Sequence, residues 1–402
     1  KGPSSILYGQ SAPGGLINMV TKQPSASPLL ELSADTDQNG STRFMLDAGG
    51  EITTDTNYRA VVVKQDVNFA RNYHNGETRT RDRFLGSLVV EHQLSDSLVI
   101  NGYYDRTNDK AGLDTGAWLD SKGDVISENN TINDFSWAFT DITVENLGAK
   151  LTYFINPLWE IKVGYNQQQF NRQRFESSPK IPSDYQSGDS YISKPYDRSD
   201  DWQFKTAFID LNGELTIAGI EHKLLFGANS LDYYYGQLKT NGAAINYTPG
   251  DIEPLKPAIS FTTDTSLSTS QYDYYGLYFQ DLMTLNQYWQ VAIGGRYDKQ
   301  NKEGANNESL LPKIAVLYHP SDHSTLYANY SEGFEPQRSE TIENEQDKNF
   351  GMRIDATTSK QIEIGAKWEL SERLLLNSAI FTIEKSGTLI SEQLLDDPNY
   401  ES

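Results

Sequence analysis

Apolar and polar residues alternate along much of the chain, and this alternation predicts β-strands. In residues 159–166 every second side chain is apolar, and the pattern returns in residues 289–298 and 362–369. A period of two places successive side chains on opposite faces of a strand, so each segment has one apolar face. The chain yields about fifteen such strands and no convincing amphipathic helix. The first strand is expected near residues 29–36 and the fifteenth near residues 374–390.

The lengths of the connections between these strands alternate as well. Short links are expected near residues 53–57, 95–97, 156–157, 218–221, 285–288, 320–324 and 371–373. Longer links lie between them, at residues 70–81, 107–145, 175–201, 236–270 and 335–358. In an up-and-down membrane barrel, tight turns face the periplasm and long loops face outside, whereas a soluble sandwich or propeller has no such alternation. The pattern therefore favours a membrane barrel whose odd-numbered strands run outward.

The composition agrees with a barrel and excludes several other classes. Hydrophobic residues make up only 37% of the chain, yet 24 Tyr, 16 Phe and 6 Trp argue against disorder. A barrel explains both values, because one face of each strand contacts lipid and the other a wet lumen. No apolar run is long enough for a transmembrane helix. The net charge of −21 excludes nucleic acid as a partner.

The odd number of predicted strands has a further consequence for the barrel. An open sheet in a bilayer leaves two edges with unpaired N–H and C=O groups, which lipid cannot satisfy. Single-chain bacterial barrels avoid this with an even, closed set of strands. We therefore expect the chain to be part of a longer barrel.

The first 24 residues, KGPSSILYGQSAPGGLINMVTKQP, contain two short strand-like stretches around a Pro-Gly-Gly turn. Read alone, this is an ordinary β-turn in which glycine supplies the positive φ values. The stretch nevertheless resembles the end of the plug domain of TonB-dependent receptors, although it begins with Lys1 where that family often has Arg. Further family-like motifs follow in order: GLYFQD at 276–281, GGRYD at 294–298, YSEGFEP at 330–336 and SKQIEIG at 359–365. Their order resembles the ferric-siderophore receptors, and the ferrichrome and hydroxamate branch most of all.

The resemblance implies an all-β fold: a transmembrane antiparallel up-and-down β-barrel of about 22 strands, filled by an N-terminal plug. Residues 1–24 are then the end of the plug domain, and residues 25–402 are a partial outer-membrane β-barrel. It also implies import of a ferric siderophore, energised by TonB through an N-terminal segment that we expect to lie outside this chain. The expected setting is the outer membrane of a Gram-negative bacterium, where a monomer contacts lipid and lipopolysaccharide.

A receptor of this kind needs no cofactor and no metal ligands of its own, because the siderophore already encloses the iron. It needs aromatic walls and a few hydrogen-bond donors. By resemblance, Tyr8 falls where ferrichrome-type receptors place a ligand-binding tyrosine at the plug apex; packing between plug and wall is the alternative. Trp118 resembles an aromatic residue of an outer loop that walls the site. Gly116 stands where the family has a neighbouring tyrosine, which puts the identity of the ligand in doubt.

Two further tyrosines follow from strand parity. Tyr233 and Tyr235 share parity with Leu225, and they face the lumen near its outer end if Phe226 faces lipid. A place in the interfacial aromatic girdle is the competing interpretation.

A pair of adjacent charges also lies on one face of a predicted strand. Arg296 and Asp298 share inward parity. Salt bridging to the plug is their expected role, with functional coupling as the alternative.

Other functions are open at this point. TonB-dependent uptake of haem, cobalamin or an oligosaccharide is possible within the same family, although a haem-receptor signature of Phe-Arg-Ala-Pro type is absent. A passive porin is disfavoured because porins lack a plug. An enzyme would need a paired-carboxylate or nucleophile constellation, and none stands out.

Overall fold

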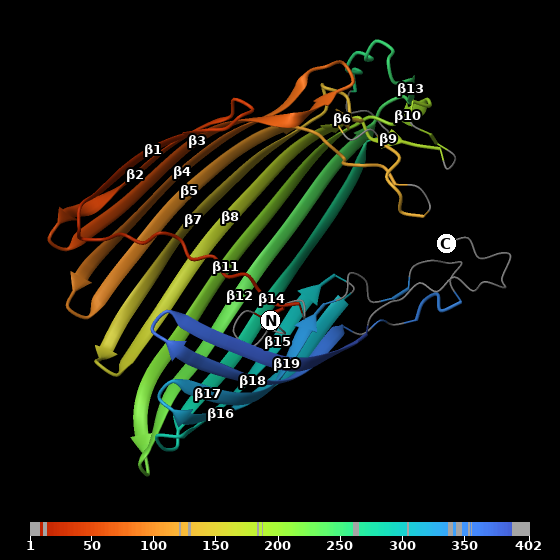
Figure 1. Cartoon of the computed structure of the whole chain (residues 1–402). Coiled ribbons are helices and arrows are strands. Elements are labelled where there is room, and N and C mark those ends of the chain that lie inside the picture. The colour runs from red at the N-terminus through yellow and green to blue at the C-terminus, as the bar shows by residue number, and fades with distance from the viewer. Residues whose placement is uncertain are drawn as a thin grey trace.

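A single curved antiparallel sheet dominates the fold (Figure 1). The computed structural model describes residues 9–10, 14–119, 122–127, 130–182, 185–186, 188–259, 265–303, 305–336, 341–342, 348–352, 354 and 356–387. Among these residues every regular element is a strand, and none forms a helix long and apolar enough to cross a bilayer.

Within the described residues, fifteen strands follow one another in the sheet in chain order, each antiparallel to the next. They are β1 (Leu29–Thr36), β2 (Thr42–Thr53), β3 (Thr56–Tyr73), β4 (Thr78–Ser95), β5 (Leu98–Gly112), β7 (Phe139–Asn156), β8 (Trp159–Glu176), β11 (Tyr196–Ile217), β12 (Ile220–Asn241), β14 (Ser266–Thr284), β15 (Trp289–Lys302), β16 (Ala305–Ser321), β17 (Ser324–Glu335), β18 (Thr357–Ser371) and β19 (Leu374–Ser386). This up-and-down order confirms the predicted fold class and the expected strand number.

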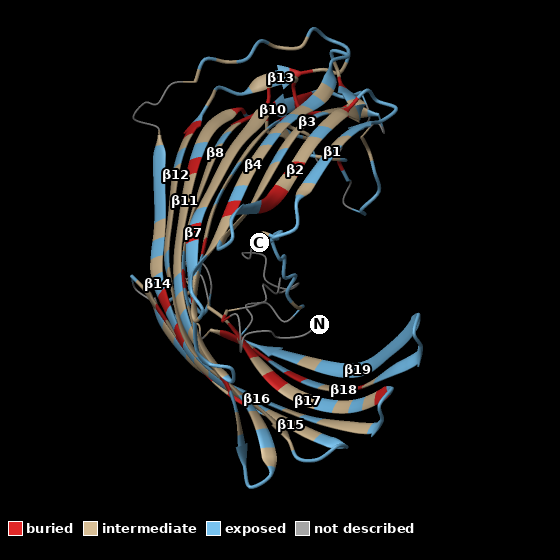
Figure 2. Cartoon of the chain, turned by 90° about the vertical axis from the view of Figure 1, so that its left-hand side faces the viewer, coloured by how far each residue is buried: buried red, intermediate tan, exposed pale blue. Residues whose placement is uncertain are grey.

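The sheet curls into the wall of a barrel, with β1 at one edge and β19 at the other (Figure 2). Four short strands lie off this path. β6 (Thr131–Ile132) pairs in parallel with β3, and β9 (Pro179–Lys180), β10 (Tyr191–Ser193) and β13 (Ile245–Tyr247) form a separate small sheet over one end of the wall.

The outer face of the wall is apolar, as the alternation predicts. Val163 on β8 lies opposite Ile209 on β11, and their side chains are 42% and 49% exposed. Exposed aromatic side chains form two bands across this face: Tyr153, Tyr288, Trp289 and Trp368 near the tight turns, and Tyr104, Tyr165, Tyr275 and Tyr297 farther along the strands. Two aromatic bands enclosing an apolar zone are typical of a barrel in an outer membrane.

Tight turns join the strands at one end of the wall. The turn between β11 and β12 consists of Ala218 and Gly219, with φ values of 51° and 84°. Positive φ at both central residues belongs to the two-residue hairpin turn whose twist matches the strands. The seven short links expected from the sequence all lie at this end, which is called the tight-turn end below.

The opposite end, called the loop end below, differs in part from the prediction. Long connections span residues 113–138, 177–195, 242–265 and 336–356, as expected. The expected long link at residues 70–81 was wrong, because β3 continues to Tyr73 and β4 begins at Thr78. Most residues of the two strands are polar there, so the alternation disappears. The strands nevertheless stay paired across an irregularity between Asn68 and Asn72, with Asn72 opposite Thr78. β15 and β16 are likewise joined by a short link.

Candidate ligand-binding site

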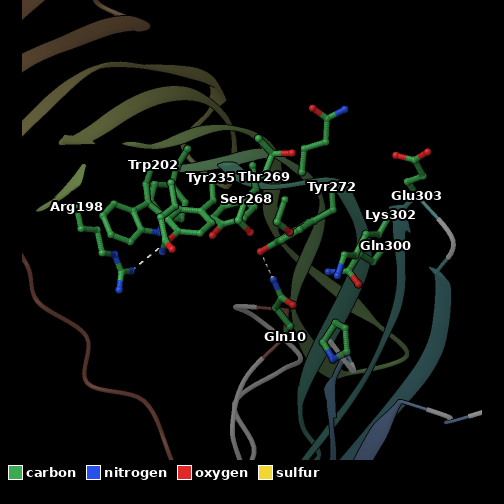
Figure 3. A pocket seen from close by; sticks show the side chains of 16 residues that line it. Gln10, Arg198, Trp202, Tyr235, Ser268, Thr269, Tyr272, Gln300, Lys302 and Glu303 are labelled. Carbon is green, nitrogen blue, oxygen red and sulfur yellow. Dashed lines mark hydrogen bonds between the residues drawn. The ribbon is translucent and has the colours of Figure 1, made fainter. Parts of the chain in front are cut away.

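A cavity of about 1370 Å³ lies on the inner face of the wall, toward the loop end of β11, β12, β14 and β15 (Figure 3). Its lining is mainly aromatic, hydroxyl and amide side chains: Gln10, Arg198, Trp202, Phe204, Tyr233, Tyr235, Gln237, Ser268, Thr269, Ser270, Gln271, Tyr272, Gln300, Lys302, Glu303 and Pro336. Gln10 comes from the segment before the first strand, and its Nε2 donates to the Tyr272 hydroxyl at 3.4 Å. The cavity thus lies between the wall and the plug-like segment.

Aromatic rings pair across neighbouring strands on the cavity side. Trp202 lies opposite Tyr235 in the strand register, and their rings stack with centroids 4.9 Å apart. Tyr233 lies opposite Phe204 and Tyr272, with ring centroids 5.2 and 4.6 Å away. Residues opposite one another in an antiparallel sheet share a face and lie close enough for such contacts. The register of three strands therefore assembles a continuous aromatic surface.

At one end of this surface, a buried carboxylate accepts hydrogen bonds from four polar side chains. The side chain of Asp200 is fully buried and accepts hydrogen bonds from two arginines. Arg172 donates from Nε and Nη2 to Oδ2 at 3.1 and 2.9 Å, and Arg198 donates from Nε to Oδ1 at 2.9 Å. The Tyr235 hydroxyl and Gln237 Nε2 also donate to Oδ1, at 2.7 and 3.2 Å. Charge-assisted bonds of this kind fix the orientation of all four partners.

The structure brings two of the four predicted site residues together. Tyr233 and Tyr235 both line the cavity, and Phe226 on the same strand is 46% exposed on the opposite face, as the parity argument requires. Tyr8 lies outside the described residues.

Trp118 lies apart from the cavity lining, in a buried aromatic cluster at the loop end. Its ring meets those of Tyr185 and Tyr191 edge-on, with centroids 5.2 and 5.0 Å away. Phe135 and Tyr247 complete the cluster. We call the described parts of residues 113–138, 177–195 and 242–259 the loop cap, because this cluster is their shared core.

Buried polar groups also fasten the loop cap. Asp134 is 1% exposed and accepts hydrogen bonds from the Thr115 amide at 2.7 Å and from the Ser177 hydroxyl at 2.6 Å. Glu253 accepts from both the amide and the hydroxyl of Ser136, each at 2.8 Å. Burial raises the pKa of Asp134, and its hydrogen bonds with Ser177 and Thr115 offset only part of that rise.

The raised pKa predicts a pH dependence of the loop cap. The folded cap holds the Asp134 proton more tightly than the unfolded loops do, so this group stabilises the cap less as the pH rises from 3.8 through the raised pKa. Hydrogen exchange of the Thr115 and Phe135 amides should therefore be better protected, relative to the main-sheet amides, at pH 4 than at pH 7. Asp134→Asn should remove this difference. An unchanged pH dependence in that variant would contradict the assignment to Asp134.

Deeper in the lumen, the predicted charge pair lies against the plug-like segment. Arg296 and Asp298 are fully buried, and Arg296 Nε donates a hydrogen bond to Asp298 Oδ1 at 2.6 Å. Arg296 Nη2 also donates to Asn229 at 2.7 Å and to the Tyr274 hydroxyl at 3.2 Å. A Cβ at Gly9 would lie 2.3 Å from that hydroxyl, so only glycine fits where this segment meets the wall. The two charges thus pair with each other, and the plug-like segment covers them.

A second contact anchors the same segment near the start of the barrel. Lys22 Nζ lies 2.5 Å from Asp47 on β2, and Arg59 on β3 bonds to the same carboxylate from Nε and Nη2 at 2.9 and 2.8 Å. The Asp47 side chain is fully buried. We call these three residues the Asp47 anchor.

Several residues of the cavity were not predicted from the sequence. Trp202, Phe204, Arg198 and Tyr272 all line it, and none was predicted. A usable signal was present, because Trp202 and Phe204 alternate with the polar residues Asp201 and Gln203. Among the described residues, no group of three or more His, Cys, Asp or Glu side chains gathers in a metal-binding arrangement.

Comparison with known proteins places the chain in a family. The family described as "TonB dependent receptor-like, beta-barrel" matches residues 89–401, and the chain belongs to it. Members of this family are transport receptors of the Gram-negative outer membrane, not enzymes.

Individual relatives are distant and longer. The metal-pseudopaline receptor CntO of Pseudomonas aeruginosa strain UCBPP-PA14 is 24% identical, over all of this chain and 58% of the relative. The ferrichrome outer membrane transporter/phage receptor of Escherichia coli K12 is also 24% identical, over 98% of this chain and 56% of the relative. The chain thus spans little more than half the length of these relatives. Other relatives are named as receptors for ferrioxamine and ferric pyoverdine.

Solved structures share the fold. The ferripyoverdine receptor of the outer membrane of Pseudomonas aeruginosa, bound to ferripyoverdine, has a TM-score of 0.82 at 19% identity. That match covers 96% of this chain and 52% of the other. The siderophore receptor PiuA of Acinetobacter baumannii has a TM-score of 0.77 at 18% identity, covering 95% and 60% of the two chains.

Proposed function

We propose that the protein containing this chain imports a ferric siderophore across the outer membrane, with energy supplied by TonB. The observation that carries the proposal is the aromatic cavity of about 1370 Å³ between the plug-like segment and the wall. Its volume suits a bulky chelate, and its rings and amides suit a ligand that presents organic groups around an enclosed metal. The names of the relatives, most of which are siderophore receptors, support the same ligand class.

Within this proposal, Tyr233 and Tyr235 contact the ligand through their rings. Tyr8 stays a prediction from the resemblance alone. Trp118 acts indirectly, by ordering the loop cap beside the cavity. The proposed protein is a monomer in lipid and lipopolysaccharide, with no cofactor of its own.

The resemblance noted in the sequence favours a hydroxamate ligand. A second candidate is a different metal chelate, because CntO is named as a metal-pseudopaline receptor and matches over all of this chain.

The test is fluorescence quenching of the purified protein in detergent by ferric and iron-free siderophores of the hydroxamate, catecholate and carboxylate types. Ferric chelates are expected to quench the fluorescence where iron-free forms do not, with a Kd of about 1 μM or lower, which corresponds to a binding free energy of roughly −8 kcal/mol.

Trp202→Leu should weaken binding of the ferric chelate about thirtyfold, or ~2 kcal/mol, because Trp202 is part of the aromatic surface. Trp289→Leu, at the tight-turn end of the outer face, is the matched control and should leave the Kd unchanged. Absence of quenching with all three types would refute the proposal.

A further inference from the structure

The cavity carries a positive charge in a chain whose net charge is −21. Two guanidinium groups, Arg172 and Arg198, meet the single carboxylate of Asp200. Arg172 contacts Oδ2 and Arg198 contacts Oδ1, each through Nε and Nη2. Two positive charges thus share one negative charge, and the group of three side chains keeps one net positive charge.

Arg198 is also the arginine of this pair that lines the cavity. Its contacts with Asp200 and with the Tyr235 hydroxyl use Nε and Nη2, on one side of the guanidinium fork. A guanidinium has five N–H donors, so the two N–H groups of Nη1 can still donate to a carboxylate of the ligand. The side chain is 22% exposed, which leaves it accessible and held in place.

The position of Arg198 relative to the rings decides which part of a ligand it meets. Figure 3 shows Arg198 beside Trp202 and Tyr235, whereas Lys302 and Glu303 lie at the other end of the cavity. Lys302 and Glu303 carry opposite charges, so they leave little net charge at their end. A chelate that packs on the aromatic surface would therefore place its periphery next to the fixed guanidinium of Arg198.

We infer that the imported chelate carries a carboxylate at its periphery and that Arg198 binds this carboxylate. The inference rests on the proposed function and makes it more specific, because it names the ligand group and the residue that selects it. It is compatible with a hydroxamate centre, since the carboxylate lies outside the iron-binding groups. A purely structural role for Arg198, as a partner of Asp200, predicts no dependence on ligand charge.

Three ferric chelates with the same iron centre test this inference directly. Ferrioxamine B ends in a primary ammonium, its N-acetyl derivative is neutral there, and its N-succinyl derivative ends in a carboxylate. The succinyl form is expected to bind about tenfold more tightly than the acetyl form, and the ammonium form least tightly. The preference should decrease with added salt, since part of it is electrostatic.

Variants then assign the preference to the residue. Arg198→Gln should abolish the advantage of the succinyl form over the acetyl form, and Arg198→Lys should retain part of that advantage. Arg106→Gln is the matched control, because Arg106 pairs with Glu145 on the outer face of the wall. It should leave the order of the three ligands unchanged.

The outcomes separate the inference from the proposed function. Equal binding of the three forms by the unmodified protein would overturn the inference and leave siderophore import standing. Binding of only a ferric polycarboxylate chelate, lost in Arg198→Gln, would support the inference and reject the hydroxamate centre. No binding by any ferric chelate would overturn both.

Discussion

Replacing Asp298 by alanine is expected to destabilise the folded barrel wall by about 3–5 kcal/mol, because Arg296 would then keep an unpaired buried charge. Both side chains are fully buried, and Arg296 also donates hydrogen bonds to Asn229 and Tyr274, which are neutral. The measurement is urea unfolding in lipid vesicles, followed by tryptophan fluorescence. The change in the unfolding free energy would come from the shifted midpoint.

Two comparisons make the Asp298 result specific. A double variant, Arg296→Met with Asp298→Leu, should recover most of the loss, since removing both charges removes the uncompensated one. Glu308→Ala, which removes the partner of Lys299 from an exposed pair, should leave the midpoint unchanged. A loss below about 1 kcal/mol for Asp298→Ala would show that water or relaxation solvates Arg296.

The second large effect is expected on the outer face. Phe226 is 46% exposed and lies opposite Leu211 and Phe279 in the register, between the two aromatic bands. Phe226→Arg should therefore destabilise the barrel by about 2–4 kcal/mol in vesicles, because it places a charge in the apolar zone. The same measurement of urea unfolding applies.

A matched control separates the bilayer effect from the substitution itself. Ile252→Arg introduces the same charge in the loop cap, at a side chain that is 95% exposed, and should change the midpoint little. Equal effects of the two substitutions, or a normal midpoint for Phe226→Arg, would mean that this face does not contact hydrocarbon.

The sequence predicted the wall well because each strand between the aromatic bands separates two solvents. Lipid on one side and water on the other force the alternation seen at Val163 and Ile209, so strand position and orientation could both be inferred. Beyond the bands, water contacts both faces. The continuation of β3 to Tyr73 therefore left no periodic signal, and the strand was mistaken for a loop.

The candidate site could be predicted only where one strand carried the information. Tyr233 and Tyr235 follow from parity within β12. Trp202 on β11 belongs to the site because the strand register places it opposite Tyr235 on β12. Asp200 belongs to it because Arg172 on the neighbouring strand β8 donates hydrogen bonds to its carboxylate. Such juxtapositions depend on neighbours far apart in the chain, which a pattern within one strand cannot specify. The small sheet of the loop cap was not predicted for a similar reason, since β9, β10 and β13 contain only two or three residues each.

The plug-like segment contacts the barrel wall at two places, at Gly9 and at the Asp47 anchor. Gly9 sits against Tyr274 and Arg296 on β14 and β15, while Lys22 is tied to Asp47 on β2, thirteen residues later. Those thirteen residues can extend to about 45 Å at most. A pull applied ahead of Gly9 would load the contact with Tyr274 and Arg296 first, because the Asp47 anchor lies thirteen residues farther along the chain. The segment would then leave the cavity while Lys22 still holds it at Asp47. This short connection keeps the effective concentration of the segment near the wall high, so the segment would rebind quickly.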